Sequence, residues 1–358
     1  MRILHVITTI ERGGAENQLV TLVRHQIALG DQVTVAYLKG RPDLLAEFEE
    51  IGAKVIRPKN LVFSFFSIAR KLNSDFDLAH AHLPRAEILL ALSNYLNFSN
   101  CVLVASRHNS ESFFPGRSAS ISAWLSRMTL RRYSSVIFIS HAVETFLRNS
   151  GEIPQQLLSS VIYYGFDDRN HVLAEPVKDL NSVANRYLFV GRLTEQKNIP
   201  LLLNAFRRLI VKKQMAELHL YGEGELEFEL RTQFQDISQN IFWHGKVSNI
   251  SDIMRDSGCL ILPSKYEGFG LVLIEAMQNA LPVIGARNSA IPEVLGEDHP
   301  GLFLTEDDLT LLLHEVQNSN FRSRILEYQS SRIFEFEPRK MSIKVRDFYD
   351  ASFRAIKG

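Results

Sequence analysis

The chain has 358 residues, longer than one hydrophobic core usually grows, so we expect two domains of roughly 150 to 200 residues each. Its 40 acidic residues balance its 40 basic ones, which argues against a nucleic-acid-binding protein, because such proteins usually carry a clear basic excess. The cysteines, Cys101 and Cys259, lie far apart in apolar segments, which indicates buried free thiols in a reducing compartment.

Short apolar runs alternate with amphipathic segments of helix length along the chain. In the first half, strands are expected at residues 2–8, 32–38, 53–57, 77–80, 101–105 and 135–139. In the second half, they are expected at residues 186–191, 217–222, 240–243, 258–262 and 282–285. This alternation is typical of parallel sheets covered by helices on both faces. The predicted fold class is therefore α/β, with two doubly wound, Rossmann-like domains.

The boundary between the domains is expected near residues 165–185, where the sequence becomes polar and loses its periodicity. We therefore assign residues 1–168 to an amino-terminal domain and residues 169–338 to a second domain. An amphipathic helix is expected at 339–356, after the last strand, and the segment 339–358 is expected to return to the first domain.

The sequence shows no segment that would direct the chain into or across a membrane. Residues 2–8 are typical of a strand that leads into a glycine turn, so we expect no signal peptide. The longest apolar runs are much shorter than the roughly 18 residues of a membrane-spanning helix. We expect a cytoplasmic protein.

The segment "YEGFGLVLIEAM", residues 266–277, follows an expected buried strand and has the pattern of a ligand site. Ligands of open α/β sheets bind beyond the carboxyl ends of the strands. Gly268 and Gly270 expose backbone there, and the first amides of the following helix favour a phosphate. Glu267 and Glu275 would lie roughly 12 Å apart if the segment were wholly helical, and carboxylates accept hydrogen bonds from sugar hydroxyls. The segment therefore predicts a nucleotide-sugar site.

Two other segments supply what a diphosphate needs. "YLFVGRLTEQKN", residues 187–198, places Arg192 and Lys197 on a loop that opens a helix, where the two cations would neutralise the phosphates. "TTIERGGAENQ" places Gly13 and Gly14 between the first strand and a helix, where their amides would form a second anion-binding turn.

These segments together carry a family resemblance. The Gly13-Gly14 turn, "FVGRLTEQKN", "YGEGEL", "LPSKYEGFGLVLIEAM" and "IPEV" resemble motifs of the retaining, nucleotide-sugar-dependent glycosyltransferases of family four, which have the GT-B fold. The motifs occur in order along nearly the whole chain. The resemblance implies an acceptor-binding first domain, a donor-binding second domain and a closing helix that returns to the first. It also implies a hexosyltransferase that builds polysaccharide or lipopolysaccharide on a glycan or lipid-linked acceptor.

The resemblance further implies roles for individual residues. Arg192 and Lys197 would hold the donor diphosphate, Glu275 would bind the ribose hydroxyls, and Glu267 would contact the donor sugar. The implied catalytic residues are His108, Glu267, Arg192 and Lys197. The implied donor-binding residues are Gly13, Gly14, Arg192, Lys197, Gly222, Val247, Glu267, Gly268, Phe269, Gly270, Leu271, Val272 and Glu275.

The implied chemistry needs neither a metal nor a separate base. The leaving diphosphate would depart from the front face of the sugar, and its own oxygen would take the acceptor's proton. The sequence shows no histidine or cysteine cluster at metal-binding spacing, and "SDFD" at 74–77 lies away from the expected phosphate site. We expect no metal or other cofactor.

The sequence departs from the family pattern at two places. Ala280 stands where the family commonly has glycine, which is tolerable if its φ angle is negative. Ser289 and Ala290 stand where the family has a glycine pair, and they would narrow the pocket.

Other segments leave alternatives open. His80 and His82 in "AHAHLPRAE" would either face the acceptor or take part in helix capping and packing. Residues 117–132 have four arginines and no acid, with apolar residues at helical spacing; this helix would either lie on an anionic membrane, helped by residues 61–66, or pack into the core. An epimerase of sugar nucleotides and a nucleotide-sugar-binding protein without turnover are the alternative functions. Because both acids and both cations are present, the pattern favours the transferase.

Overall fold

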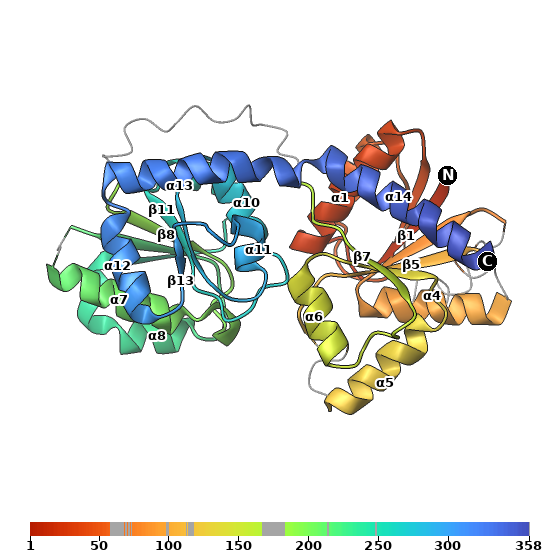
Figure 1. Cartoon of the computed structure of the whole chain (residues 1–358), viewed down its shortest axis with the longest axis horizontal. Coiled ribbons are helices and arrows are strands. Elements are labelled where there is room, and N and C mark those ends of the chain that lie inside the picture. The colour runs from red at the N-terminus through yellow and green to blue at the C-terminus, as the bar shows by residue number, and fades with distance from the viewer. Residues whose placement is uncertain are drawn as a thin grey trace. The chain divides into compact units, whose positions relative to one another are not determined.

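The computed structural model describes residues 1–57, 68, 70, 72, 74–97, 100–111, 113, 118–166, 183–212, 215–247 and 249–357. The chain divides into two compact units (Figure 1). Unit 1 consists of Met1–Asp167 and Phe336–Gly358, and unit 2 consists of Asp168–Glu335.

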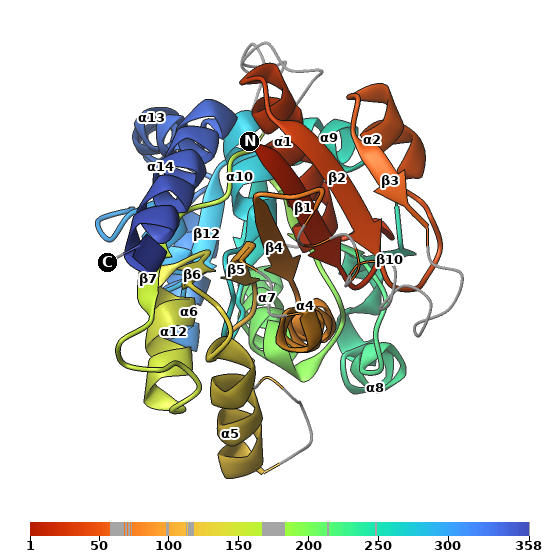
Figure 2. The same ribbon diagram turned by 90° about the vertical axis from the view of Figure 1, so that its right-hand side faces the viewer.

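Unit 1 contains a seven-stranded sheet with the order β3-β2-β1-β4-β5-β6-β7. Every neighbouring pair is parallel, and Figure 2 shows β2, β1 and β4 side by side. The strands are β1 (Arg2–Ile7), β2 (Gln32–Tyr37), β3 (Lys54–Ile56), β4 (Leu78–His82), β5 (Val102–Arg107), β6 (Ser135–Phe138) and β7 (Leu158–Val161). The helices are α1 (Gly14–Ala28), α2 (Leu45–Glu50), α4 (Pro84–Asn97), α5 (Ala119–Leu130), α6 (His141–Asn149) and α14 (Pro338–Lys357).

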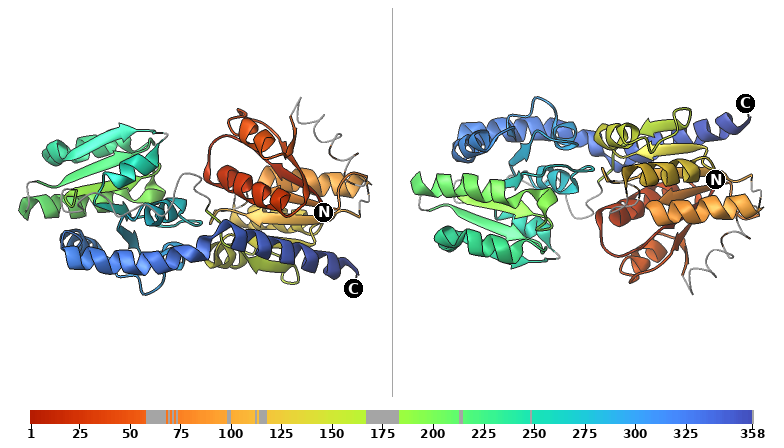
Figure 3. Two further views of the ribbon diagram at one scale, coloured as in Figure 1. Left: turned by 90° about the horizontal axis from the view of Figure 1, so that it is seen from above. Right: turned by 90° about the horizontal axis from the view of Figure 1, so that it is seen from below.

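Helix α14 belongs to unit 1 although it lies at the carboxyl end of the chain. Its apolar residues Met341, Val345 and Phe348 join one buried cluster with residues of β4 and β5. Figure 3 shows this helix beside the amino-terminal elements. A 20-residue amphipathic helix needs a partner for its apolar face, and the sheet of unit 1 provides it.

Unit 2 contains a six-stranded parallel sheet with the order β10-β9-β8-β11-β12-β13. The strands are β8 (Arg186–Val190), β9 (Glu217–Tyr221), β10 (Ile241–Gly245), β11 (Cys259–Leu262), β12 (Val283–Ala286) and β13 (Leu302–Phe303). The helices are α7 (Ile199–Lys212), α8 (Glu227–Gln233), α9 (Ile250–Arg255), α10 (Leu271–Gln278), α11 (Ile291–Leu295), α12 (Glu306–Glu315) and α13 (Ser319–Arg332). Short 3₁₀ helices η1 (Glu195–Lys197), η2 (Gln235–Asn240) and η3 (Ile333–Phe336) complete the chain.

The structure confirms the predicted fold class. Each expected strand corresponds to an observed one, because the central strands are buried on both faces and therefore appear as continuous apolar runs, such as Cys259–Leu262. The expected list omits β7 and β13. Strand β7 has the half-buried, partly polar sequence LSSV, and β13 has two residues, so neither shows a clear apolar run.

No helix in the described part of the chain combines the length and apolarity that crossing a bilayer requires.

Candidate functional site

The loop between β11 and α10 holds Glu267 in a set of specific contacts. The Lys197 ammonium forms an ion pair with the Glu267 carboxylate, and Ser264 Oγ donates to the same Oε1 at 2.7 Å. Ser289 Oγ donates to the backbone oxygen of Glu267 at 2.8 Å. Phe269 is 2% exposed and anchors the loop in the core. The structure thus brings together the predicted residues Glu267 and Lys197.

Gly270 turns the chain from this loop into α10. Its φ angle is +89°, a conformation that glycine adopts without strain, and a Cβ there would lie 3.1 Å from a side-chain carbon of Leu273. The N-cap residue of α10 is Gly270, which has no side chain to cap the helix, so the helix begins with backbone amides at Leu271 and Val272 next to the loop. Such an end has the polarity that favours an anion.

The loop after β8 carries the predicted cations beside the loop after β11. Lys197 closes η1, and Asn198, at φ +51°, turns the chain into α7. Gln196 joins the two loops, because its Nε2 donates to the backbone oxygen of Tyr266 at 2.9 Å and its backbone oxygen accepts from the Lys265 amide at 2.8 Å. The loops meet because β8 and β11 are neighbours in the sheet.

Arg192 is exposed and lines a pocket of about 430 Å³ within unit 2, at the carboxyl ends of β8, β9 and β10. The predicted residues Gly222 and Val247 line the same pocket. A Cβ at Gly222 would lie 1.9 Å from the backbone oxygen of Gly191, so no larger residue fits there. The pocket is lined by Val190, Gly191, Arg192, Tyr221, Gly222, Glu223, Lys246, Val247 and Ile250.

The predicted donor-binding residues and the residues that line this pocket overlap only in part. Tyr221, Glu223 and Lys246 line it but were not among the predicted site residues, although Tyr221 and Glu223 lie in the motif "YGEGEL". The available signal was that Glu223 and Lys246 each follow the end of a predicted strand. Glu275 lies half-buried on α10 and is not among the residues that line this pocket.

In unit 1, the predicted Gly13-Gly14 turn stands at the start of α1. Gly13 is the N-cap residue, and Gly14 is the first residue of the helix. The carboxylate of Glu16 folds back over Gly13, where it occupies the space of a Cβ, and Thr9 Oγ1 donates to it at 2.7 Å. The predicted Gly13-Gly14 turn is therefore present, and the carboxylate of Glu16, from α1, lies against it.

His108 lies on the loop that follows β5 and is bound by two aromatic neighbours. Its Nε2 lies 3.2 Å from His82 Nδ1, and its Nδ1 is hydrogen-bonded to the Tyr164 hydroxyl. Burial lowers the pKa of His108 to about 3, and the nearby Arg107 acts in the same direction. His108 is therefore a neutral imidazole at physiological pH.

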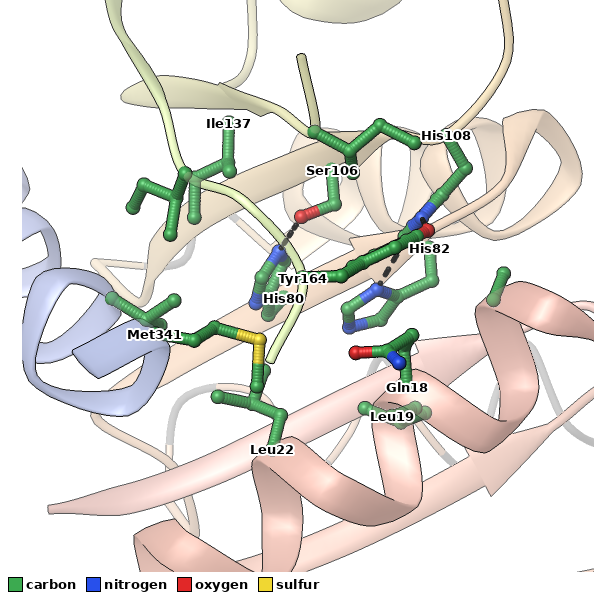
Figure 4. A pocket seen from close by; sticks show the side chains of 14 residues that line it. Gln18, Leu19, Leu22, His80, His82, Ser106, His108, Ile137, Tyr164 and Met341 are labelled. Carbon is green, nitrogen blue, oxygen red and sulfur yellow. Dashed lines mark hydrogen bonds between the residues drawn. The ribbon is translucent and has the colours of Figure 1, made fainter. Parts of the chain in front are cut away.

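His80 and His82 are buried residues of β4 rather than helix caps. Both face a cavity of about 30 Å³ in unit 1, together with His108, Tyr164 and Gln18 (Figure 4). Gln18 is 5% exposed, and its Oε1 has no hydrogen-bond partner among the described residues. The structure shows both rings packed inside unit 1, and their role at the acceptor stays a prediction.

The expectation that no histidine cluster has metal-binding spacing was wrong for the folded chain. Ring nitrogens of His5, His80 and His82 lie within 4.8 Å of one another. Spacing along the sequence could not reveal this group, because His5 and His80 belong to different strands. They meet because β1 and β4 are neighbours with His5 and His80 in register.

Ala280 does not meet the condition set for it, a negative φ angle. Its φ angle is +49°, because Ala280 follows the last turn of α10 and ends the helix in a left-handed residue. The Leu281 amide bonds to the Ala276 oxygen at 2.9 Å and the Ala280 amide to the Met277 oxygen at 3.1 Å, the Schellman pattern in which glycine is preferred. Ser289 has φ +53°, so it keeps a glycine-like conformation.

Comparison with known proteins covers both units. Residues 12–169 match the family model Glycosyltransferase Family 4, and residues 175–318 match the model Glycosyl transferases group 1. A Campylobacter jejuni protein, "GalNAc-alpha-(1->4)-GalNAc-alpha-(1->3)-diNAcBac-PP-undecaprenol alpha-1,4-N-acetyl-D-galactosaminyltransferase", is 23% identical over 94% of this chain and 95% of that protein. The phosphatidyl-myo-inositol mannosyltransferase of Mycolicibacterium smegmatis is 25% identical over 77% of this chain and 71% of that protein.

A solved structure has the same fold over the full length. Anabaena Alr3699/HepE in complex with UDP-glucose superposes with a TM-score of 0.80 and 20% identity over 98% of this chain and 100% of that one. The two family matches show that the chain belongs to the family-4 type of glycosyltransferases. The likeness to this structure and the two doubly wound sheets show that the fold is GT-B.

Proposed function

We propose that this glycosyltransferase moves a hexose, with retention of configuration, from a nucleotide diphosphate sugar to a glycan or lipid-linked acceptor in polysaccharide or lipopolysaccharide synthesis. The observation that carries the proposal is the pairing of Lys197 with Glu267 near the start of α10, where the N-cap residue is a glycine. A cation, a carboxylate and helix amides in one place match the phosphate and the sugar hydroxyls of such a donor.

The donor occupies unit 2 along the carboxyl ends of its strands. Lys197 and Arg192 neutralise the diphosphate, Glu267 binds hydroxyls of the sugar, and Glu275 binds those of the ribose. The pocket that Arg192 shares with Gly222 and Val247 receives part of the nucleoside. Support comes from the structural neighbour from Anabaena, which was solved with UDP-glucose.

The reaction proceeds at the front face of the donor sugar. The oxygen of the leaving diphosphate takes the proton of the acceptor hydroxyl, while Arg192 and Lys197 stabilise the charge that develops on the phosphates. No protein base is needed, which agrees with a neutral His108 whose two ring nitrogens are both hydrogen-bonded. Because these fixed cations do the neutralising, the reaction needs no metal, and EDTA should leave the rate unchanged.

The acceptor side includes a membrane-facing surface on α4 and α5, two neighbouring helices of unit 1. Apolar side chains are exposed on both helices, and the Arg132 guanidinium lies 4.5 Å from the centre of the Tyr95 ring. We name this the α4–α5 surface; its exposed apolar residues are Leu92, Tyr95, Leu96, Ile121, Trp124 and Met128. Apolar and aromatic residues beside arginines suit an anionic leaflet, which would place the enzyme at the cytoplasmic face of the membrane.

Part of the predicted membrane segment lies outside the described residues. Arg117 and residues 61–66 belong to that part. The membrane proposal therefore stands on the α4–α5 surface. Lipid-linked acceptors support it, because the names of the Campylobacter and Mycolicibacterium relatives refer to undecaprenol and phosphatidylinositol.

The test is incubation of the purified protein with a panel of nucleotide sugars. Slow release of the nucleotide in water, with one donor preferred, supports a transferase. An epimeric sugar nucleotide would indicate the isomerase instead, and binding without any product would indicate a binding protein. Retention is tested separately by NMR of the anomeric proton in the product, where inversion would refute it.

A further inference from the structure

A continuous chain of hydrogen bonds leads from helix α1 to His108 inside unit 1. Gln26 Oε1 lies 2.8 Å from His5 Nε2, and His5 Nδ1 lies 3.0 Å from His82 Nε2. His82 Nδ1 then lies 3.2 Å from His108 Nε2, and His108 Nδ1 bonds to the Tyr164 hydroxyl (Figure 4). Gln26, His5 and His82 are each at most 3% exposed, so bulk solvent does not compete for these bonds.

All the hydrogen bonds between Gln26 and His108 are donated in the same direction, because a neutral imidazole donates from one nitrogen and accepts at the other. Burial keeps the rings neutral, since it lowers the pKa of His5 to about 4 and that of His108 to about 3. The oxygen of the Gln26 amide can only accept. His5 must therefore donate from Nε2 to Gln26 and accept at Nδ1 from His82. For the same reason, His82 accepts at Nδ1 from His108 Nε2.

A second branch starts at the same amide. Gln26 Nε2 donates to the Tyr349 hydroxyl at 3.3 Å, and that hydroxyl lies 2.7 Å from His80 Nδ1. His80 Nε2 in turn lies 2.8 Å from Ser106 Oγ. Because Tyr349 accepts from the amide, it donates to His80. Turning the Gln26 amide around would reverse every donor and acceptor in both branches.

We propose that Gln26 is a positioning residue for His108. Through His5 and His82, its amide oxygen selects the tautomer in which His108 carries its proton on Nε2 and accepts from Tyr164 at Nδ1. Gln26 contacts His108 only through His5 and His82, so it acts on the orientation of that ring. The catalytic consequence rests on the proposed function, because His108 is implied to be catalytic only in a glycosyltransferase of this family, whereas the tautomer itself does not depend on that function.

The same three histidines, His5, His80 and His82, are grouped closely enough to hold a metal ion. A histidine ligand needs a bare lone pair pointing at the metal. Here the Nδ1 lone pairs are already used, that of His5 by His82, that of His82 by His108 and that of His80 by Tyr349. The hydrogen-bond chain therefore accounts for the cluster better than a metal does.

The direct test is ¹⁵N NMR of the full-length protein labelled at histidine, with signals assigned from single His→Gln variants. We expect His5, His82 and His108 to carry the proton on Nε2 in the wild type. Gln26→Glu should preserve this state, because an ionised carboxylate can only accept a hydrogen bond from His5. Gln26→Met removes the acceptor at similar volume and should give mixed tautomers at His108.

Three results would overturn the proposal. One is a proton on Nδ1 of His108 in the wild type, and another is an unchanged tautomer in Gln26→Met. The third is a shift of the His5, His80 and His82 signals when one equivalent of zinc chloride is added, because that would identify a metal site.

Activity supplies a second readout. Gln26→Met should lower kcat about tenfold, in the range found when residues that orient functional histidines are lost, while the donor KM stays within about twofold. Gln26→Glu should recover most of kcat. Equal losses in the two variants would indicate a purely structural role and refute the proposal. If the protein transfers no sugar at all, the proposed function fails, while the NMR result still decides the tautomer.

Discussion

Lys197 and Glu267 form an ion pair across 70 positions of sequence, with side chains that are 13% and 8% exposed. The pair links the loop after β8 to the loop after β11. Each partner balances the charge of the other. A donor would therefore have to redirect Lys197 toward phosphate and leave Glu267 to bind a sugar hydroxyl.

The first prediction concerns the two cations of this site. Arg192→Ala and Lys197→Ala should each lower turnover of the preferred donor roughly a hundredfold or more, because each removes a charge that stabilises the leaving diphosphate. The control is Lys265→Ala, which removes an ion pair with the exposed Glu195 and should leave turnover near that of the wild type. Full activity in both Arg192→Ala and Lys197→Ala would remove the basis for the phosphate site.

The left-handed conformation of Ala280 predicts a stabilising substitution. Ala280→Gly should raise the free energy of unfolding by about 1 kcal/mol, because a left-handed conformation costs an alanine about that much and glycine little. Ala276→Gly, within the same helix, should lower it by about the same amount. Urea midpoints measured with an unchanged slope would show both effects. A lower midpoint for Ala280→Gly would show that the residue is not strained.

Glu87 makes stability depend on pH. Burial raises the pKa of Glu87 to about 7 from an ordinary value of 4.5, Arg107 acts against this shift, and Glu152 adds to it. The folded state therefore binds the proton more tightly than the unfolded state, and this contribution to stability is lost as the pH rises from about 4.5 to about 7. The loss is on the order of 3 kcal/mol.

The variant Glu87→Gln isolates this effect, because its amide does not titrate. Urea midpoints of the wild type and the variant should be compared at pH 5 and pH 8. The wild type should lose stability relative to Glu87→Gln on going to pH 8. A difference that is the same at both pH values would mean that Glu87 does not titrate in this window.

The α4–α5 surface can be tested by fluorescence, since the sequence has only two tryptophans. In Trp243→Phe the remaining emission comes from Trp124, which is 58% exposed on α5. Vesicles with anionic phosphatidylglycerol should shift this emission to shorter wavelength at low salt, and added salt should reverse the shift. Neutral phosphatidylcholine vesicles are the control. No shift and no sedimentation with anionic vesicles would exclude the membrane proposal.

The sequence predicted the fold, and it predicted the place of Arg192, for one physical reason. Arg192 follows a parallel strand, and the ends of parallel strands meet at one edge of the sheet; Gly222 and Val247, which line the same pocket, were implied only by the family resemblance. Positions that follow predicted strands could therefore be expected to converge.

Other features depend on contacts that no local pattern records. The group of His5, His80 and His82 exists only because β1 and β4 are paired in one register. The left-handed turn at Ala280 follows from where α10 ends, and the residue type alone suggested the opposite. The pairing of Lys197 with Glu267 likewise depends on the order of strands in unit 2.

The most direct test of the central claim is a crystal structure with the donor that the nucleotide-sugar panel selects. We predict the diphosphate beside Arg192, Lys197 and the start of α10, the sugar at Glu267 and the ribose at Glu275. A donor bound away from these groups, or a fully active enzyme whose donor makes no contact with them, would contradict the account.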